Sequence, residues 1–136
     1  MDIVIDFDGT VVTHDFPSVG KDIGAVPVLR RLVGRGHRLI LFTMRSNGEP
    51  IHGDFETDGQ YLDHAVEWFR SNGIELWGIQ TNPEQASWTT SPKAYGKLII
   101  DDAALGAPLK TDRSISGRPF IDWVRAEEML EDANVL

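Results

Sequence analysis

The segment "MDIVIDFDGT", residues 1–10, predicts a buried strand that ends in two acidic residues. Residues 3–5 are β-formers, and they lead directly into Asp6 and Asp8. Side chains alternate along a strand, so both carboxylates would lie on the same face if the strand continued. Two like charges that close repel each other unless a cation lies between them. The segment therefore predicts a charged site at the carboxyl end of a core strand.

The remaining chain alternates predicted strands and helices, which favours a mainly parallel sheet joined by crossover helices. The strands are predicted over residues 3–7, 37–43, 74–81 and 97–101, and the helices over residues 26–36, 57–73, 91–96 and 122–132. Asp122 is the expected N-cap of the last helix, and Thr57 or Asp58 that of the second. The pattern predicts an α/β fold.

Composition narrows the class of protein. A chain of 136 residues, 41% hydrophobic and 25% charged, fits one globular domain over residues 1–136. The absence of cysteine excludes disulfides and thiolate metal sites. A formal net charge of −8 argues against binding to nucleic acid or to anionic lipid. No apolar run has membrane length and no signal-peptide pattern begins the chain, so we expect no membrane association and a cytoplasmic location.

Polar side chains follow three of the predicted strands. They are Asp6 and Asp8, Thr43 and Arg45, and Asp101 and Asp102. Ligands of parallel sheets bind beyond the carboxyl ends of the strands, so these side chains are expected to meet at one edge. Four carboxylates there require a cation, and a site with only hard oxygen ligands favours Mg²⁺.

Three of these segments resemble the ordered motifs of the haloacid dehalogenase (HAD) superfamily. "DFDGT" (6–10) is similar to its first motif, "LILFTMR" (39–45) to its second and "KLIIDD" (97–102) to its fourth. More specifically, the chain resembles the small, capless, phosphatase-like hydrolases of that superfamily. The resemblance implies a three-layer Rossmann-like (HAD-like) fold with no cap domain. It also implies a Mg²⁺-dependent phosphohydrolase that acts through an aspartyl-phosphate intermediate.

The resemblance assigns roles to the four acidic residues. Asp6 would be the nucleophile and a metal ligand. Asp8 would protonate the leaving group, activate water afterwards and bind the metal through its backbone carbonyl oxygen. Asp101 would bind the metal directly, while Asp102 would contact it directly or through water, or would cap the segment that follows.

The phosphate-binding residues implied by the resemblance come from the first two motifs. Gly9 allows a tight turn, and the backbone groups that follow it would donate to phosphate oxygens, whereas Thr10 is expected to support the turn rather than take part in the chemistry. Thr43 would donate its hydroxyl to the phosphate, beside Met44, or would simply suit a strand end. Arg45 would form a fork to the phosphate or would lie in solvent.

The third motif of the superfamily is a lysine, and two lysines are candidates. Lys97 begins the predicted strand 97–101, which places it at the edge of the sheet away from Asp101. Lys93 lies near the start of the predicted helix 91–96, and a helix that precedes a parallel strand begins near the catalytic edge. Lys93 is therefore the predicted catalytic lysine.

The chain has no room for a cap domain, since only sixteen residues separate Thr10 from Pro27. His14 is close enough to the first motif to line the mouth of the site. An open site suits a bulky or macromolecular phosphate unless a second subunit closes it. The acidic loop between the second predicted strand and the second predicted helix disfavours a polyanion, so a small phosphorylated metabolite is the expected substrate. The alternative to a phosphatase is a catalytically weak phosphate-binding or regulatory protein on the same fold.

Overall fold

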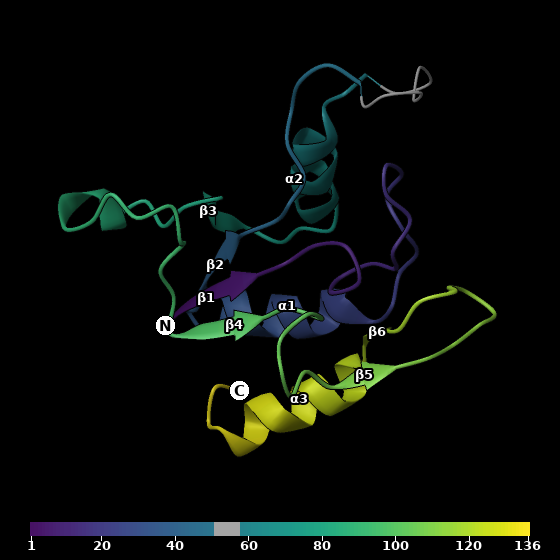
Figure 1. The fold of residues 1–136 in the computed structure, drawn as a ribbon. Coiled ribbons are helices and arrows are strands. Elements are labelled where there is room, and N and C mark those ends of the chain that lie inside the picture. Colours follow the sequence, from purple (N-terminus) through teal and green to yellow (C-terminus); the bar gives the residue numbers. More distant parts are fainter. Residues whose placement is uncertain (51–57) are drawn as a thin grey trace.

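The computed structural model describes residues 1–50 and 58–136. Its main sheet contains β1 (Asp2–Ile5), β2 (Arg38–Leu41), β3 (Leu76–Ile79) and β4 (Leu98–Ile100). The helices are α1 (Ala25–Gly34), α2 (Tyr61–Ser71), α3 (Trp123–Asp132) and the short 3₁₀ helix η1 (Gln85–Ser87). A small second sheet pairs β5 (Leu109–Lys110) with β6 (Phe120–Ile121). The predicted α/β fold is confirmed (Figure 1).

The main sheet is parallel and has the order β3-β2-β1-β4. Ile5 of β1 is level with Leu41 of β2 on one side and with Ile100 of β4 on the other. The next residues along β1 and β4, Asp6 and Asp101, therefore leave the sheet at the same edge. The pairing of these strands therefore agrees with the prediction, made from the hydrophobic runs, that the acidic residues meet at one edge of the sheet.

Side-chain alternation divides the sheet into two differently covered faces. Ile3 and Ile5 face a core to which β2 and all three α-helices contribute. Val4 faces the other way and packs with Ile40 and Ala94, beneath the chain between β3 and β4. The fold is Rossmann-like with three layers, and its third layer is this β3–β4 segment rather than a full helix.

The predicted helix 91–96 is wrong, because the side chain of Gln85 takes the hydrogen bonds that a helix would need. Gln85 is buried, and its amide nitrogen donates to the carbonyl oxygens of Ser91 and Lys93, 3.1 Å away in each case. Its amide oxygen accepts from the backbone N–H groups of Asn82 and Tyr95. These bonds hold residues 91–96 as an irregular segment.

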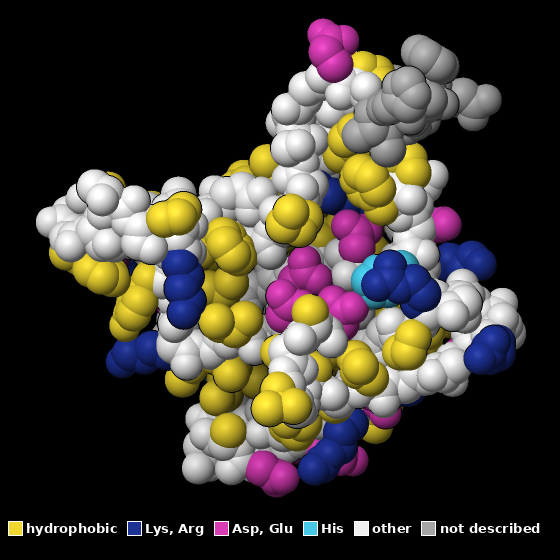
Figure 2. Space-filling model, viewed as in Figure 1, with side chains coloured by type: hydrophobic (Ala, Val, Ile, Leu, Met, Phe, Trp, Pro, Cys, Tyr) yellow, Lys and Arg dark blue, Asp and Glu magenta, His cyan; other side chains and the backbone are white. Residues whose placement is uncertain are grey.

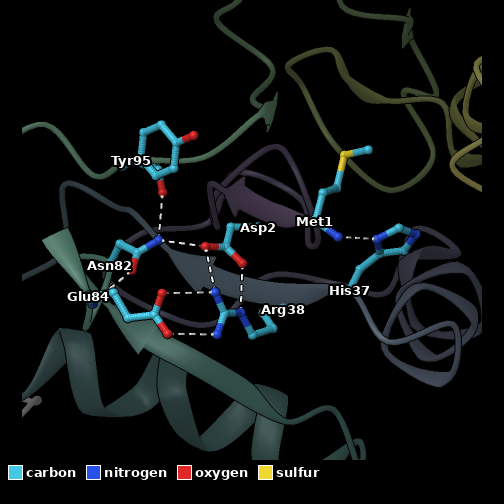
Figure 3. A network of polar contacts seen from close by, with 7 residues as sticks. All are labelled: Met1, Asp2, His37, Arg38, Asn82, Glu84 and Tyr95. Carbon is cyan, nitrogen blue, oxygen red and sulfur yellow. Dashed lines mark hydrogen bonds and ion pairs between the residues drawn. The ribbon is translucent and has the colours of Figure 1, made fainter.

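A polar network also fastens the β3–β4 segment to the amino edge of the sheet (Figure 3). Arg38 forms a fork on Asp2 and a second contact with Glu84. Asn82 donates to Asp2 and to the carbonyl oxygen of Tyr95. The hydrogen bond from Arg38 is the main reason that the pKa of Asp2 lies below its usual value, so this carboxylate stays ionised beside its partners.

The helix ends follow their expected caps only in part. Asp122 caps α3, because its carboxylate accepts from the N–H groups of Val124 and Arg125. The N-cap of α2 is Gln60, not Asp58, whose carboxylate instead accepts from the N–H of Gln60; residue 57 lies outside the described residues. None of the helices in the described ranges has the length and apolar character needed to cross a bilayer.

The hairpin of β5 and β6 was not predicted. Together with α3 it lies next to β4, the strand at one edge of the main sheet (Figure 1). Ile121 of β6 donates its N–H to the carbonyl oxygen of Gly9, 3.0 Å away. The indole of Trp123 donates to the carbonyl oxygen of Thr10 at 2.7 Å. The C-terminal part of the chain thereby supports the loop that carries Asp6 and Asp8.

Candidate functional site

A pocket of about 490 Å³ lies at the carboxyl edge of the main sheet. Its walls are formed by Asp6, Asp8, His14, Phe16, Thr43, Met44, Arg45, Asp101, Asp102, Ala103 and Arg118. Figure 2 shows acidic side chains gathered in the middle of this face, with histidine and basic side chains beside them. The pocket therefore lies at the edge of the sheet where the polar residues after the strands predicted a ligand site.

Three of the predicted metal ligands converge in this pocket. One carboxylate oxygen each from Asp6, Asp101 and Asp102 lies within 4.8 Å of the others. Two oxygens that share one hard cation are at most about 4–5 Å apart, so the three carboxylates fit such an ion. The carboxylate of Asp8 is not one of this trio. The N–H of Ala103 bonds to Asp101, and no helix follows, so Asp102 is not a helix cap.

The environment of Asp6 favours its protonated form when no cation is present. Burial is the largest cause, and the charges of Asp101 and Asp102 add to it, so that the pKa of Asp6 is raised to about 7. Hydrogen bonds from the Phe7 backbone and the Thr10 hydroxyl act in the opposite direction. The carboxylate therefore needs a positive charge nearby to be fully ionised at neutral pH.

This raised pKa predicts a pH-dependent stability in the absence of metal. The folded chain holds a proton on Asp6 more tightly than the unfolded chain, whose pKa is near 3.8. The resulting stabilisation is complete below about pH 3.8 and is lost as pH rises through about 7. The full span is of the order of 4 kcal/mol. If the trio binds Mg²⁺, as the sequence predicts, added Mg²⁺ should restore stability at pH 8 by pairing with the ionised carboxylate.

Urea unfolding in chelator between pH 5 and pH 8, repeated with Mg²⁺, measures this effect. Asp6→Asn is the matched control, since it keeps every histidine and should remove this part of the slope. An unchanged slope in Asp6→Asn would show that other groups cause the pH dependence.

Gly9 and Thr10 support the acidic trio and do not face the pocket, which corrects their predicted phosphate-binding role. The N–H groups of Gly9 and Thr10 already donate to backbone carbonyl oxygens. The buried Thr10 hydroxyl donates to Asp6 at 2.9 Å and accepts from the N–H of Asp102 at 3.0 Å. Gly9 has φ +78°, and a Cβ there would lie 2.0 Å from His14. The two residues join the ends of β1 and β4.

Arg45 holds Asp8 and is not free in solvent or for a phosphate. Its Nε and Nη2 atoms each lie 2.8 Å from a carboxylate oxygen of Asp8. The guanidinium also donates to the carbonyl oxygens of Ser18 and Tyr61. The side chain of Arg45 is only 1% exposed, while that of Asp8 is 20% exposed. Both predicted alternatives for Arg45 are therefore wrong.

Thr43 and Met44 lie in the pocket wall, as predicted. The Thr43 hydroxyl oxygen accepts from the N–H of Arg45 at 3.1 Å, and no acceptor for its own proton is found among the described residues. The side chain of Gln80 holds both backbone groups of Thr43, at 2.8 and 2.7 Å. Thr43 is thus a rigid donor that faces the pocket, and the fully exposed Met44 forms part of the rim.

Among the described residues, no lysine lines this pocket. Lys93 is exposed and lines a separate pocket with Trp88 and Tyr95. Lys97 donates its N–H to the carbonyl oxygen of Asp2, at the opposite edge of the sheet as expected. The predicted position of Lys93 depended on the helix 91–96, and the absence of that helix removes the reason for it.

Three residues of the pocket wall, Phe16, Ala103 and Arg118, were not predicted, and the expected His14 has a defined partner. Arg118 comes from the β5–β6 hairpin and Phe16 from the loop after β1, and neither stands in a pattern that marks a site. His14 contacts Asp102, with 2.8 Å between Nε2 and Oδ2. Both side chains of this pair are mostly buried.

Comparison with solved structures shows a similar protein. No protein-family model matches the chain, and no curated protein matches it significantly. A solved structure, described as that of a conserved protein coded by a locus from Bacteroides thetaiotaomicron, is 33% identical, with a TM-score of 0.71. The match covers 98% of this chain and 91% of that one. With that identity over nearly the whole length of both proteins, the chain belongs to the same family as the conserved Bacteroides thetaiotaomicron protein.

Proposed function

We propose that this protein is a Mg²⁺-dependent phosphohydrolase that cleaves phosphomonoesters through an aspartyl phosphate on Asp6, as HAD phosphatases do. The observation that carries the proposal is the convergence of Asp6, Asp101 and Asp102 in an open pocket that also contains the hydroxyl of Thr43. The order and spacing of the segments 6–10, 39–45 and 97–102, which resemble HAD motifs, support the same function. A phosphorylated small molecule remains the substrate class that suits the pocket.

In this mechanism, each of these four residues has its own role. Asp6, Asp101 and Asp102 would hold the cation, which supplies positive charge beside the reacting phosphoryl group. An oxygen of Asp6 attacks phosphorus, and the bond from phosphorus to the leaving oxygen breaks. Thr43 donates to a nonbridging phosphoryl oxygen. Water then attacks phosphorus and releases Asp6 and phosphate.

Asp8 would transfer the proton in this mechanism, and its carboxylate already accepts two hydrogen bonds from Arg45. A proton on Asp8 must therefore sit on an oxygen that Arg45 also contacts, or the fork must loosen. Arg45 in turn holds the carboxylate in one orientation toward the pocket. We assign Arg45 to the positioning of Asp8.

A catalytically weak phosphate-binding or regulatory protein is the second candidate. The observation that favours it is the composition of the pocket wall. None of the described residues that line it is a lysine, and Asp8 is paired with the buried guanidinium of Arg45. Both candidates use the same metal and the same phosphate position. They differ only in turnover.

Screening the purified protein against phosphorylated metabolites, with Mg²⁺ and with chelator, distinguishes the two candidates. A phosphatase should release inorganic phosphate from at least one compound, and chelator should abolish the release. Stabilisation by phosphorylated ligands without any turnover would favour the binding role. Release that is unaffected by chelator would contradict the proposed mechanism.

A further inference from the structure

The acidic pocket contains more negative than positive charge. Four aspartates line it, whereas the arginines and lysines found among the described residues of its wall are Arg45 and Arg118. Arg45 is buried and committed to Asp8. Even with a divalent cation on the aspartate trio, an incoming phosphate dianion needs another positive group nearby.

Arg118 is the basic residue of this wall whose guanidinium is unpaired. Among the described residues, its side chain makes no hydrogen bond or ion pair, although its backbone N–H bonds to the Ser116 hydroxyl at 3.2 Å. The side chain is exposed and lines the pocket. Figure 2 shows basic side chains next to the acidic centre of this face. A free guanidinium at such a place is suited to an anion.

The hairpin holds Arg118 close to the site. Phe120, two residues later, is fully buried, and Ile121 is bonded to the carbonyl oxygen of Gly9. One end of the loop is thus attached to the segment that carries Asp6 and Asp8. The side chain itself remains free to adjust to a ligand.

We propose that Arg118 binds the phosphoryl oxygens of the substrate, in the role that the sequence predicted for Lys93. The inference rests on the proposed function and makes it more specific, because it gives the site a phosphate-binding cation from the C-terminal hairpin. A guanidinium can donate two parallel hydrogen bonds to a tetrahedral oxyanion, which an ammonium group does less well. Arg118 therefore selects for the phosphate group and not for the leaving group.

Titration calorimetry with inorganic phosphate in saturating MgCl₂ tests this role without any turnover. Arg118→Ala should bind phosphate about 10- to 100-fold more weakly than the unaltered protein, and Arg118→Lys should fall between them. Arg113→Ala removes another exposed arginine of the same loop, and Lys93→Ala removes the residue first predicted. Both controls should bind phosphate normally. Unchanged unfolding midpoints would show that the exposed substitutions leave the fold intact.

The outcomes separate this inference from the proposed function. Equal phosphate affinity in Arg118→Ala and the unaltered protein would overturn the role of Arg118, even if the protein hydrolyses phosphomonoesters. No phosphate binding by the unaltered protein would also overturn it. Arg118-dependent binding without turnover of any phosphomonoester would support Arg118 and contradict the phosphatase.

Discussion

Asp6→Asn should lower the turnover of an aryl phosphate by at least about a thousandfold. The amide cannot form the phosphorylated intermediate, and it is a poorer partner for the cation. The fold should persist, because asparagine has nearly the same shape and removes one of three neighbouring carboxylates. Phosphate release with Mg²⁺ gives the activity, and urea unfolding in chelator at pH 8 confirms the fold.

Asp15→Asn is the matched control for this experiment. Asp15 is exposed and does not line the pocket, so its substitution removes the same charge from the same region without touching the trio. Its turnover should equal that of the unaltered protein. Activity of Asp6→Asn within tenfold of that value would mean that Asp6 is not the nucleophile.

Arg45→Ala should destabilise the protein by about 3–5 kcal/mol. The substitution leaves the Asp8 carboxylate without its cation and leaves the carbonyl oxygens of Ser18 and Tyr61 without this donor. It also removes a guanidinium that lies 4.9 Å from the ring centre of Phe7. Urea unfolding at pH 7 measures the loss.

A double-mutant cycle identifies the source of this effect. Arg45→Met combined with Asp8→Asn should be less destabilised than Arg45→Met alone, because no unpaired charge remains in the partly buried site. Arg70→Ala is the control, since the ion pair of Arg70 with Glu67 lies in solvent and its loss should change little. Additive effects of the two substitutions would contradict a direct coupling of Arg45 and Asp8.

Local pattern was enough to predict the strands that carry the site. Apolar runs indicated β1, β2 and β4, and each of these runs ends one or two residues before a polar group. The carboxyl ends of adjacent parallel strands share one edge, so Asp6 and Asp101 had to meet once the strands paired. Asp122 capped α3 as predicted, because a cap depends only on its own helix.

Local pattern failed where a side chain outside the predicted element decided the outcome. Residues 91–96 have the composition of a short helix, but the amide of Gln85 occupies their backbone groups. Arg45 looked like a substrate ligand or a surface residue, but Asp8 lies 37 residues away in the chain and faces it. Gln85 lies six to ten residues before the groups that it bonds, but no helix or turn pattern marks it as their partner, and Asp8 is far outside the sequence around Arg45.

The sequence by itself determined which residues form the strands of the main sheet and that a parallel sheet would bring the acidic residues to one edge. The absence of cysteine also limited any metal ligand to oxygen or histidine nitrogen atoms. Tertiary structure alone decided where the basic side chains lie relative to the acidic ones. Arg45 is buried against Asp8, and Lys93 lies in another pocket. Arg118 of the β5–β6 hairpin lines the acidic pocket. The physical reason is the distance along the chain over which each kind of interaction acts. Periodicity and caps act over a few residues, whereas the partner of a charge is fixed by the packing of segments that are distant in the chain.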